Sequence, residues 1–90
     1  MKDSFLIHAA CVQMGCLPGN PDENTGKMVA YIRRIKEERP DTDLIVFPEC
    51  AVTGYECEGC YERCAETLRD GTHVTTLCAA ARENAVLLVF

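Results

Sequence analysis

The chain has 90 residues, of which 48% are hydrophobic and 26% are charged, and its formal net charge is -5 at pH 7. This length suits one small domain or part of a larger one, and the composition is that of a globular chain, not of a disordered or membrane-spanning one. The negative charge repels phosphate and argues against nucleic acid as a partner.

The N-terminal stretch could be mistaken for a secretion signal. A signal needs an uninterrupted apolar centre behind a positive start, whereas Lys2 is cancelled by Asp3, and His8 and Gln13 interrupt the apolar run. The apolar runs are also far too short to cross a bilayer. We therefore expect a cytoplasmic protein without a membrane partner, in which the seven cysteines are reduced thiols and not a disulfide framework.

The first predicted elements are a strand, a helix and a second strand. Residues 5–13 are mostly apolar without a helical stripe and predict a buried strand. In the helix that follows, Asn20 is the capping residue, Pro21 suits the first helical position, and Pro40 ends the helix. Residues 43–47, DLIVF, predict a central strand covered by helices on both faces. Together the strand, the helix and the second strand form a βαβ unit, in which the two strands run parallel.

The rest of the chain repeats this pattern. Tyr61 and Leu68 lie on one face of a predicted short helix, and Thr72 can cap a second helix. Residues 85–90, AVLLVF, predict a third strand that is buried and central. A fully apolar strand at the end of the segment would leave an edge unpaired. We therefore expect residues 1–90 to be the N-terminal portion of a single domain, cut within its third strand.

Glu49 directly follows the second predicted strand and is the main candidate for a catalytic residue. Pro48 lacks an N–H and ends the strand, which leaves Glu49 at the carboxyl edge of a parallel sheet, where catalytic groups collect. A carboxylate partly shielded from water there has a raised pKa and suits a general base. The alternative is that Glu49 only caps or pairs within a loop, and the spacing alone leaves both interpretations open.

Three segments together resemble the nitrilase superfamily of carbon-nitrogen hydrolases. They are IHAACVQM (7–14), PDENTGKMVAYIRRI (21–35) and DLIVFPECAVTGY (43–55). Members of this family show a glutamine-containing first strand, a helix with an asparagine, and a strand that leads into Phe-Pro-Glu and Thr-Gly-Tyr. The corresponding positions here are Gln13, Asn24, 47–49 and 53–55. The resemblance covers essentially the whole chain.

The resemblance implies an α/β fold, the N-terminal part of an αββα sandwich that starts with βαβ units. It also implies a Glu-Lys-Cys triad that cleaves a non-peptide C–N bond in a small amide, carbamoyl or nitrile substrate, with Glu49 as the general base and no cofactor. By the same resemblance, Tyr55 lines the substrate pocket and the protein forms a homodimer or higher oligomer. The lysine and the cysteine of the triad are implied to lie beyond residue 90, so the segment alone is expected to be inactive.

Two interpretations from other classes stay open. The chain can be a catalytically silent fragment or an interaction module that keeps the first units of the fold. The C-x2-C-x3-C spacing of Cys57, Cys60 and Cys64 also permits a metal or redox module. The usual cluster spacings differ, however, and a second CxxC is missing, so partly buried thiols without a metal are the favoured interpretation.

Three other polar residues are given structural roles. Cys50 is adjacent to Glu49, but neighbours on extended backbone point to opposite faces, so we expect Cys50 to fill space. His8 lies within the first predicted strand and is expected to be a hydrogen-bonded core residue. His73 is expected at the surface near the start of a helix.

Overall fold

The computed structural model describes residues 6–90, which form three helices and one three-stranded sheet. The elements in chain order are β1 (Ala9–Cys11), α1 (Pro21–Glu38), β2 (Leu44–Val46), α2 (Tyr61–Cys64), α3 (Thr72–Glu83) and β3 (Leu87–Val89). The strand order is β1-β2-β3, and both neighbouring pairs are parallel. The prediction of a parallel βαβ unit is therefore confirmed.

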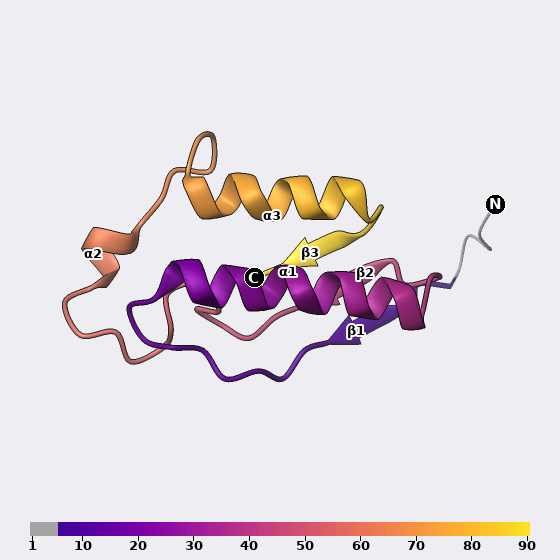
Figure 1. The fold of residues 1–90 in the computed structure, drawn as a ribbon, viewed down its shortest axis with the longest axis horizontal. Coiled ribbons are helices and arrows are strands. Elements are labelled where there is room, and N and C mark those ends of the chain that lie inside the picture. Colours follow the sequence, from indigo (N-terminus) through magenta and orange to yellow (C-terminus); the bar gives the residue numbers. More distant parts are fainter. Residues whose placement is uncertain (1–5) are drawn as a thin grey trace.

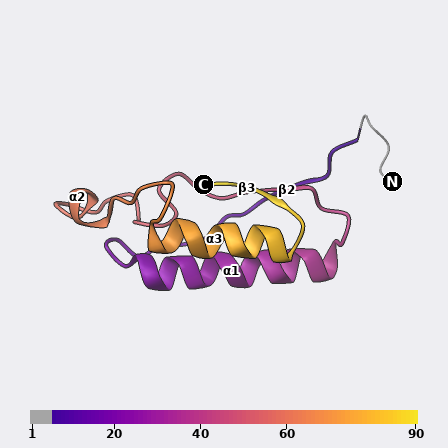
Figure 2. The ribbon, with the colours of Figure 1, turned by 90° about the horizontal axis from the view of Figure 1, so that it is seen from above.

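Helices α1 and α3 cover the same face of the sheet (Figure 1 and Figure 2). Ile45, at the centre of β2, is fully buried on this face. Successive side chains of a strand alternate between faces, and on the other face Leu87 is 70% and Val89 is 51% exposed. Within residues 6–90, the predicted helix cover on both faces of the second strand is wrong. The third strand is likewise neither central nor buried, because β3 forms an edge of the sheet.

Helix α1 begins and ends where the sequence predicts. The Asn20 Oδ1 accepts a hydrogen bond from the Glu23 N–H (3.3 Å), and Pro21 occupies the first turn. The helix ends at Glu38, two residues before Pro40, because proline restricts the residue before it to extended backbone. Capping and proline act over a few residues, so the sequence alone fixes these bounds.

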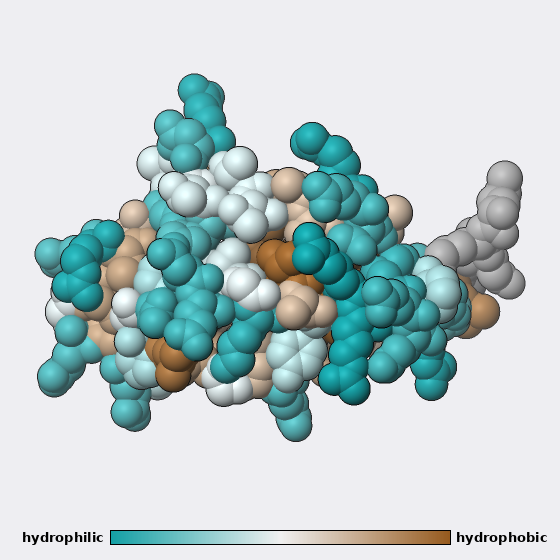
Figure 3. Space-filling view, viewed as in Figure 1, coloured by the Kyte–Doolittle hydropathy of each residue, from teal (hydrophilic) through white to brown (hydrophobic). Residues whose placement is uncertain are grey.

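The core lies between the two long helices and the sheet. Met28 and Ile32 of α1 and Leu77 of α3 are fully buried and pack in one cluster with Ile45 and Phe47. The opposite sides of the helices are polar, and hydrophilic side chains predominate on the helix-bearing face (Figure 3). This division between faces is typical of amphipathic helices on a sheet.

Two predicted elements are shorter than expected. The first strand spans only Ala9–Cys11, and the preceding Ile7 is 75% exposed; residue 5 lies outside the described residues. The predicted helix containing Tyr61 and Leu68 ends at Cys64, and Leu68 is 89% exposed. The helix stops because the next residue, Ala65, adopts extended backbone. The short α2 lies at one end of the molecule, beyond the strands (Figure 1).

Among residues 6–90, no helix combines the length and the apolar character needed to cross a membrane. Lys2 and Asp3, on which the argument against a secretion signal partly rested, lie outside the described residues.

Candidate functional site

The turn after β2 carries Glu49. Phe47 is buried, and its N–H donates to the Val89 carbonyl of β3 (2.9 Å), so the sheet is paired up to the residue before Pro48. The chain then turns, and the Gly54 N–H donates to the Cys50 carbonyl (2.8 Å). Glu49 thus lies at the carboxyl end of the central strand, as predicted. Its side chain is exposed in this structure, so the described residues alone do not shield its carboxylate from water.

Cys50 adopts an unusual backbone conformation in this turn. Its φ is 56°, in the left-handed region that residues with a Cβ rarely adopt. Cys50 therefore does not lie on extended backbone, and the alternation of faces expected for Glu49 and Cys50 does not apply. Left-handed backbone in a residue other than glycine costs about 1 kcal/mol or more and persists where the surroundings hold it in place. Contacts around the turn must therefore fix its shape.

Asn24 supplies one of these contacts and two more within the segment that precedes α1. This residue is fully buried near the start of α1. Its Nδ2 donates to the Val52 carbonyl (2.9 Å) and to the Leu17 carbonyl (2.8 Å), and its Oδ1 accepts from the Leu17 N–H (2.7 Å). A neutral amide offers two donors and an acceptor in one group. The sequence motif marks Asn24 but gives no sign of this role, because its partners Leu17 and Val52 come together only in the fold.

A close approach of two backbones also holds the turn. Gly54 has a φ of 85°, and a Cβ at this position would lie 2.6 Å from the Cα of Pro18. Only glycine combines this backbone with this approach. Beside it, the Gly19 N–H donates to the Thr53 carbonyl (2.7 Å). The segment before α1 and the turn after β2 therefore form one unit around Glu49.

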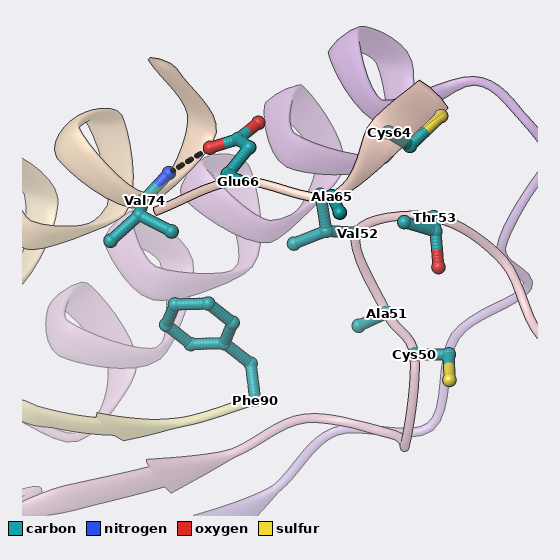
Figure 4. Close-up of a pocket in the computed structure, with 9 residues that line it drawn as sticks. All are labelled: Cys50, Ala51, Val52, Thr53, Cys64, Ala65, Glu66, Val74 and Phe90. Atoms are coloured by element: carbon teal, nitrogen blue, oxygen red, sulfur yellow. Dashed lines mark hydrogen bonds between the residues drawn. The ribbon is translucent and has the colours of Figure 1, made fainter. Parts of the chain in front are cut away.

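A mostly apolar pocket of about 260 Å³ lies between this turn and α3 (Figure 4). Its lining residues are Cys50, Ala51, Val52, Thr53, Cys64, Ala65, Glu66, Val74 and Phe90. Figure 4 shows the ring of Phe90 pointing toward Val74, and the Glu66 carboxylate hydrogen-bonded to the Val74 N–H. Glu49 is not among the lining residues. The pocket is therefore adjacent to the predicted site but distinct from it.

Glu66 caps α3 and binds a histidine. Its Oε1 accepts from the backbone N–H groups of His73 (2.8 Å) and Val74 (3.1 Å), and its Oε2 contacts the His73 Nδ1. The His73 Nε2 lies 2.7 Å from the Asp22 Oδ1. The capping role predicted for Thr72 thus belongs to Glu66, because Gly71 is the N-cap residue and has no side chain to donate or accept.

These contacts shift the pKa values of both partners. The hydrogen bond to Asp22, followed by that to Glu66, raises the pKa of His73, although burial acts in the opposite direction. Burial raises the pKa of Glu66, but the hydrogen bonds from His73 and Val74 outweigh it and lower this pKa below its ordinary value. The charged forms of His73 and Glu66 therefore stabilise each other.

The exposure of the two histidines differs from what the sequence predicts. The His73 side chain is 15% exposed, whereas that of His8 is 50% exposed and lies near Asp41 (3.5 Å) and Asp43 (3.7 Å). The core position predicted for His8 is therefore wrong. His73 lies near the start of a helix as predicted, but it is partly buried instead of exposed because it contacts residues seven and 51 positions away. No local pattern signals a contact over these separations.

Tyr55 and Cys57 line a second hollow, whereas Cys64 lines the apolar pocket. Tyr55 is 65% exposed and lines a hollow with Cys57 and Tyr61 that is separate from the apolar pocket. The Cα atoms of Cys57 and Cys60 are 5.3 Å apart, close enough for a disulfide, and the expectation that the seven cysteines are reduced thiols stays a prediction. Cys64 is free and half-buried. Within residues 6–90, no group of three His, Cys, Asp or Glu side chains is placed to hold a metal ion.

The family model of carbon-nitrogen hydrolases matches residues 8–90. The chain belongs to the carbon-nitrogen hydrolase family. It is also similar to a probable nitrilase of Schizosaccharomyces pombe, with 33% identity over 81 residues that cover 90% of this chain and 30% of that protein. The chain therefore spans about a third of the length of this curated relative. The resemblance of the sequence to this family is confirmed, and the Glu49 turn lies within the part that the carbon-nitrogen hydrolase model matches.

Proposed function

We propose that the chain is the opening part of a hydrolase that cleaves a non-peptide C–N bond in a small amide, carbamoyl or nitrile substrate, with Glu49 as the general base. Membership of the carbon-nitrogen hydrolase family supports the reaction class. The position of Glu49 supports its role, because it follows the central strand in a turn fixed by Asn24 and Gly54. Catalytic groups need this kind of rigid support.

In the proposed reaction, the Glu49 carboxylate takes the proton of a thiol as the sulfur attacks the substrate carbon. The protonated carboxyl group then gives this proton to the leaving nitrogen, and the carboxylate finally activates a water molecule. A lysine stabilises the charge of the intermediate. Lys27 and Lys36 are unsuited to this role, because their Nζ atoms bind the backbone carbonyls of Gly15, Pro40 and Thr42. We therefore assign the lysine and the nucleophilic cysteine to parts of the protein outside these 90 residues.

The proposal includes the αββα sandwich. The face of the sheet opposite α1 and α3 carries apolar side chains, and Leu87 and Val89 on it are largely exposed. A continuous apolar surface of this kind is rarely left open to water. A second sheet packed on this face would bury it and place α1 and α3 in an outer layer. By the same family resemblance, we propose a cytoplasmic enzyme that forms homodimers or higher oligomers, needs no cofactor, and lines its substrate pocket with Tyr55.

The deciding experiment replaces Glu49 in the whole protein. Glu49→Gln keeps the size of the side chain but cannot accept a proton, so turnover of amide, carbamoyl or nitrile substrates should fall by roughly 10²–10⁴-fold. The thermal unfolding transition should not change, because the side chain makes no buried contact in this turn. Glu58→Gln is the matched control, since Glu58 is also exposed and should be replaceable without loss of turnover.

The outcomes separate the proposal from its alternative. Full turnover by the Glu49→Gln variant would reject Glu49 as the base. No turnover of any substrate in the panel by the unchanged protein would instead favour the catalytically silent interaction module.

A further inference from the structure

Cys57 and Cys60 stand at the two ends of a tight turn. Their Cα atoms are 5.3 Å apart, within the range of about 4.4–6.8 Å that a disulfide requires. The Cys60 N–H donates to the Cys57 carbonyl (3.1 Å). Between them, Gly59 adopts the left-handed backbone that this turn contains, with a φ of 70°. The backbone therefore holds the two cysteines at pairing distance even without a bond between them. We propose that Cys57 and Cys60 are a reversible dithiol-disulfide site that exchanges with thiol reductants and disulfide oxidants.

The pair packs against the segment that precedes α1. Cys57 is 3% and Cys60 is 2% exposed. A Cβ at Gly19 would lie 3.8 Å from the Cys57 Sγ and 3.9 Å from the Cys60 Cβ. The N–H of the same Gly19 donates to Thr53, in the turn that carries Glu49. Packing against Gly19 thus fastens the Cys57–Cys60 turn to the unit that positions Glu49, and a bond between the two cysteines would keep the packed turn in this shape.

Few other contacts hold the segment around the pair. Tyr55, Glu56 and Glu58 are exposed, and α2, which follows directly, contributes no buried residue. Segments with few buried contacts open locally at a low free-energy cost. Such opening gives a reductant access to sulfur atoms that are buried in the closed form. The disulfide closes a ring of only four residues, so chain entropy stabilises it less than a disulfide that closes a long loop.

The reductant supplies the electrons and protons that the exchange requires. A thiolate of a dithiol attacks one of the two sulfurs, the bond between Cys57 and Cys60 breaks, and a mixed disulfide forms. The second thiolate of the dithiol resolves this mixed disulfide. The pair gains two electrons and two protons, and the reductant leaves as a disulfide. Oxidation runs in reverse with a small-molecule disulfide as the oxidant.

The test titrates the whole protein with mixtures of reduced and oxidised dithiothreitol. Samples are quenched with acid, alkylated and digested with trypsin, which releases Cys50, Cys57 and Cys60 in the peptide 37–63 and Cys64 in the peptide 64–69. We expect Cys57 and Cys60 to gain their labels together, in one two-electron transition, as the proportion of reductant rises. Cys50 is free and should be labelled throughout, which makes it an internal reference.

Two variants assign the transition to this pair. Cys64→Ser should leave the transition unchanged, whereas Cys57→Ser should remove it and leave Cys60 labelled in every mixture. Labelling of both cysteines in every mixture would overturn the proposal, because no disulfide would form. Protection of both in excess reductant, without denaturant, would also overturn it, because the bond would then be permanent. Loss of the transition in Cys64→Ser would show that the pairing was assigned to the wrong residues.

A native digestion tests the link between the disulfide and the loop, and it requires no variant. Trypsin cleavage after Arg63, in α2, should become roughly tenfold faster when the pair is reduced, because the bond no longer restricts local opening. The control site is Arg33, which lies within α1 and should be cleaved at the same rate in both states. An unchanged rate after Arg63 would contradict the fastening role.

Discussion

The His73 Nε2 lies 2.7 Å from the Asp22 Oδ1, which joins the first turn of α3 to the first turn of α1 across 51 residues of chain. Glu66 faces the other ring nitrogen. Because both nitrogens face carboxylate oxygens, the protonated ring can donate a hydrogen bond on each side. Glu66 also lines the apolar pocket. This ionic cluster therefore fixes one wall of the pocket to both long helices.

We expect the stability of the protein to depend on pH through this cluster. The pKa of His73 is raised above its ordinary value of 6.5, so its contribution is complete below pH 6.5 and is lost as the pH rises through the raised pKa. The pKa of Glu66 is lowered from 4.5, so its contribution is complete above pH 4.5 and is lost as the pH falls through the lowered value. The cluster stabilises the fold most between these two ordinary values.

Urea unfolding of the whole protein at pH 5.5 and pH 8 measures this effect. At pH 5.5 the cluster should raise the free energy of unfolding by about 1 kcal/mol relative to pH 8. Hydrogen bonds between charged groups contribute more than this only when they are well buried, and the Asp22 side chain is 92% exposed. His73→Gln should lose this pH-dependent contribution. His8→Gln, at an exposed histidine that is also near carboxylates, is the control. Equal pH dependence in the two variants would contradict the assignment to His73.

Alanine at two glycines should have opposite effects on stability. A Cβ at Gly71 would lie 2.5 Å from the Glu66 Cβ and 2.7 Å from the Thr67 carbonyl oxygen. Gly71→Ala should therefore displace the carboxylate that caps α3 and cost about 2 kcal/mol. Gly26 is an exposed residue of α1 with nothing within 4 Å of an added Cβ, so Gly26→Ala should stabilise the protein by about 0.5–1 kcal/mol. Thermal unfolding temperatures that shift in the same direction would refute this account.

The sequence predicts what a few neighbouring residues decide. Asn20, Pro21 and Pro40 determine the bounds of α1, since capping and the restrictions of proline act within one helical turn. The apolar run at 43–47 predicts β2, and Pro48 correctly places Glu49 after the strand. The parallel pairing follows because one helix connects the two strands.

Contacts between distant segments escape the same reasoning. Leu68 fits a helical stripe, yet the chain leaves the helix at Ala65 and Glu66 reaches forward to α3. The burial of His73 depends on Asp22, which only the packing of α1 beside α3 brings near. Helix cover on both faces of β2 was inferred from its composition, but composition shows only that both faces avoid water and not what covers each of them.

Asn24 provides a third prediction, on the support of the Glu49 turn. Asn24→Leu keeps the branched shape of the side chain, with a larger volume, but leaves the Leu17 N–H and the Leu17 and Val52 carbonyls without their partner. Unpaired buried polar groups cost about 1–3 kcal/mol each, and relaxation of the turn recovers part of this cost. We expect a loss of about 3 kcal/mol in the free energy of unfolding, measured with urea.

The matched control for Asn24 is Asn84. Its Nδ2 makes one hydrogen bond, to the Ala80 carbonyl at the end of α3 (2.8 Å), and the residue is only half-buried. Asn84→Leu should cost less than about 1 kcal/mol. Similar losses for the two variants would mean that the hydrogen bonds of Asn24 do not hold the turn.

Leu87 and Leu68 distinguish a sheet face that is covered in the whole protein from one that is open. Both side chains are largely exposed in residues 6–90, at 70% and 89%, but Leu87 lies on the apolar face of the sheet and Leu68 lies in a loop. If a second sheet packs on this face, Leu87→Gln should lower the free energy of unfolding of the whole protein by at least about 2 kcal/mol, since it buries an amide without partners. Leu68→Gln should change it by less than about 0.5 kcal/mol. A small effect at both positions would mean that water reaches this face in the whole protein. That result would contradict a second sheet packed against Leu87.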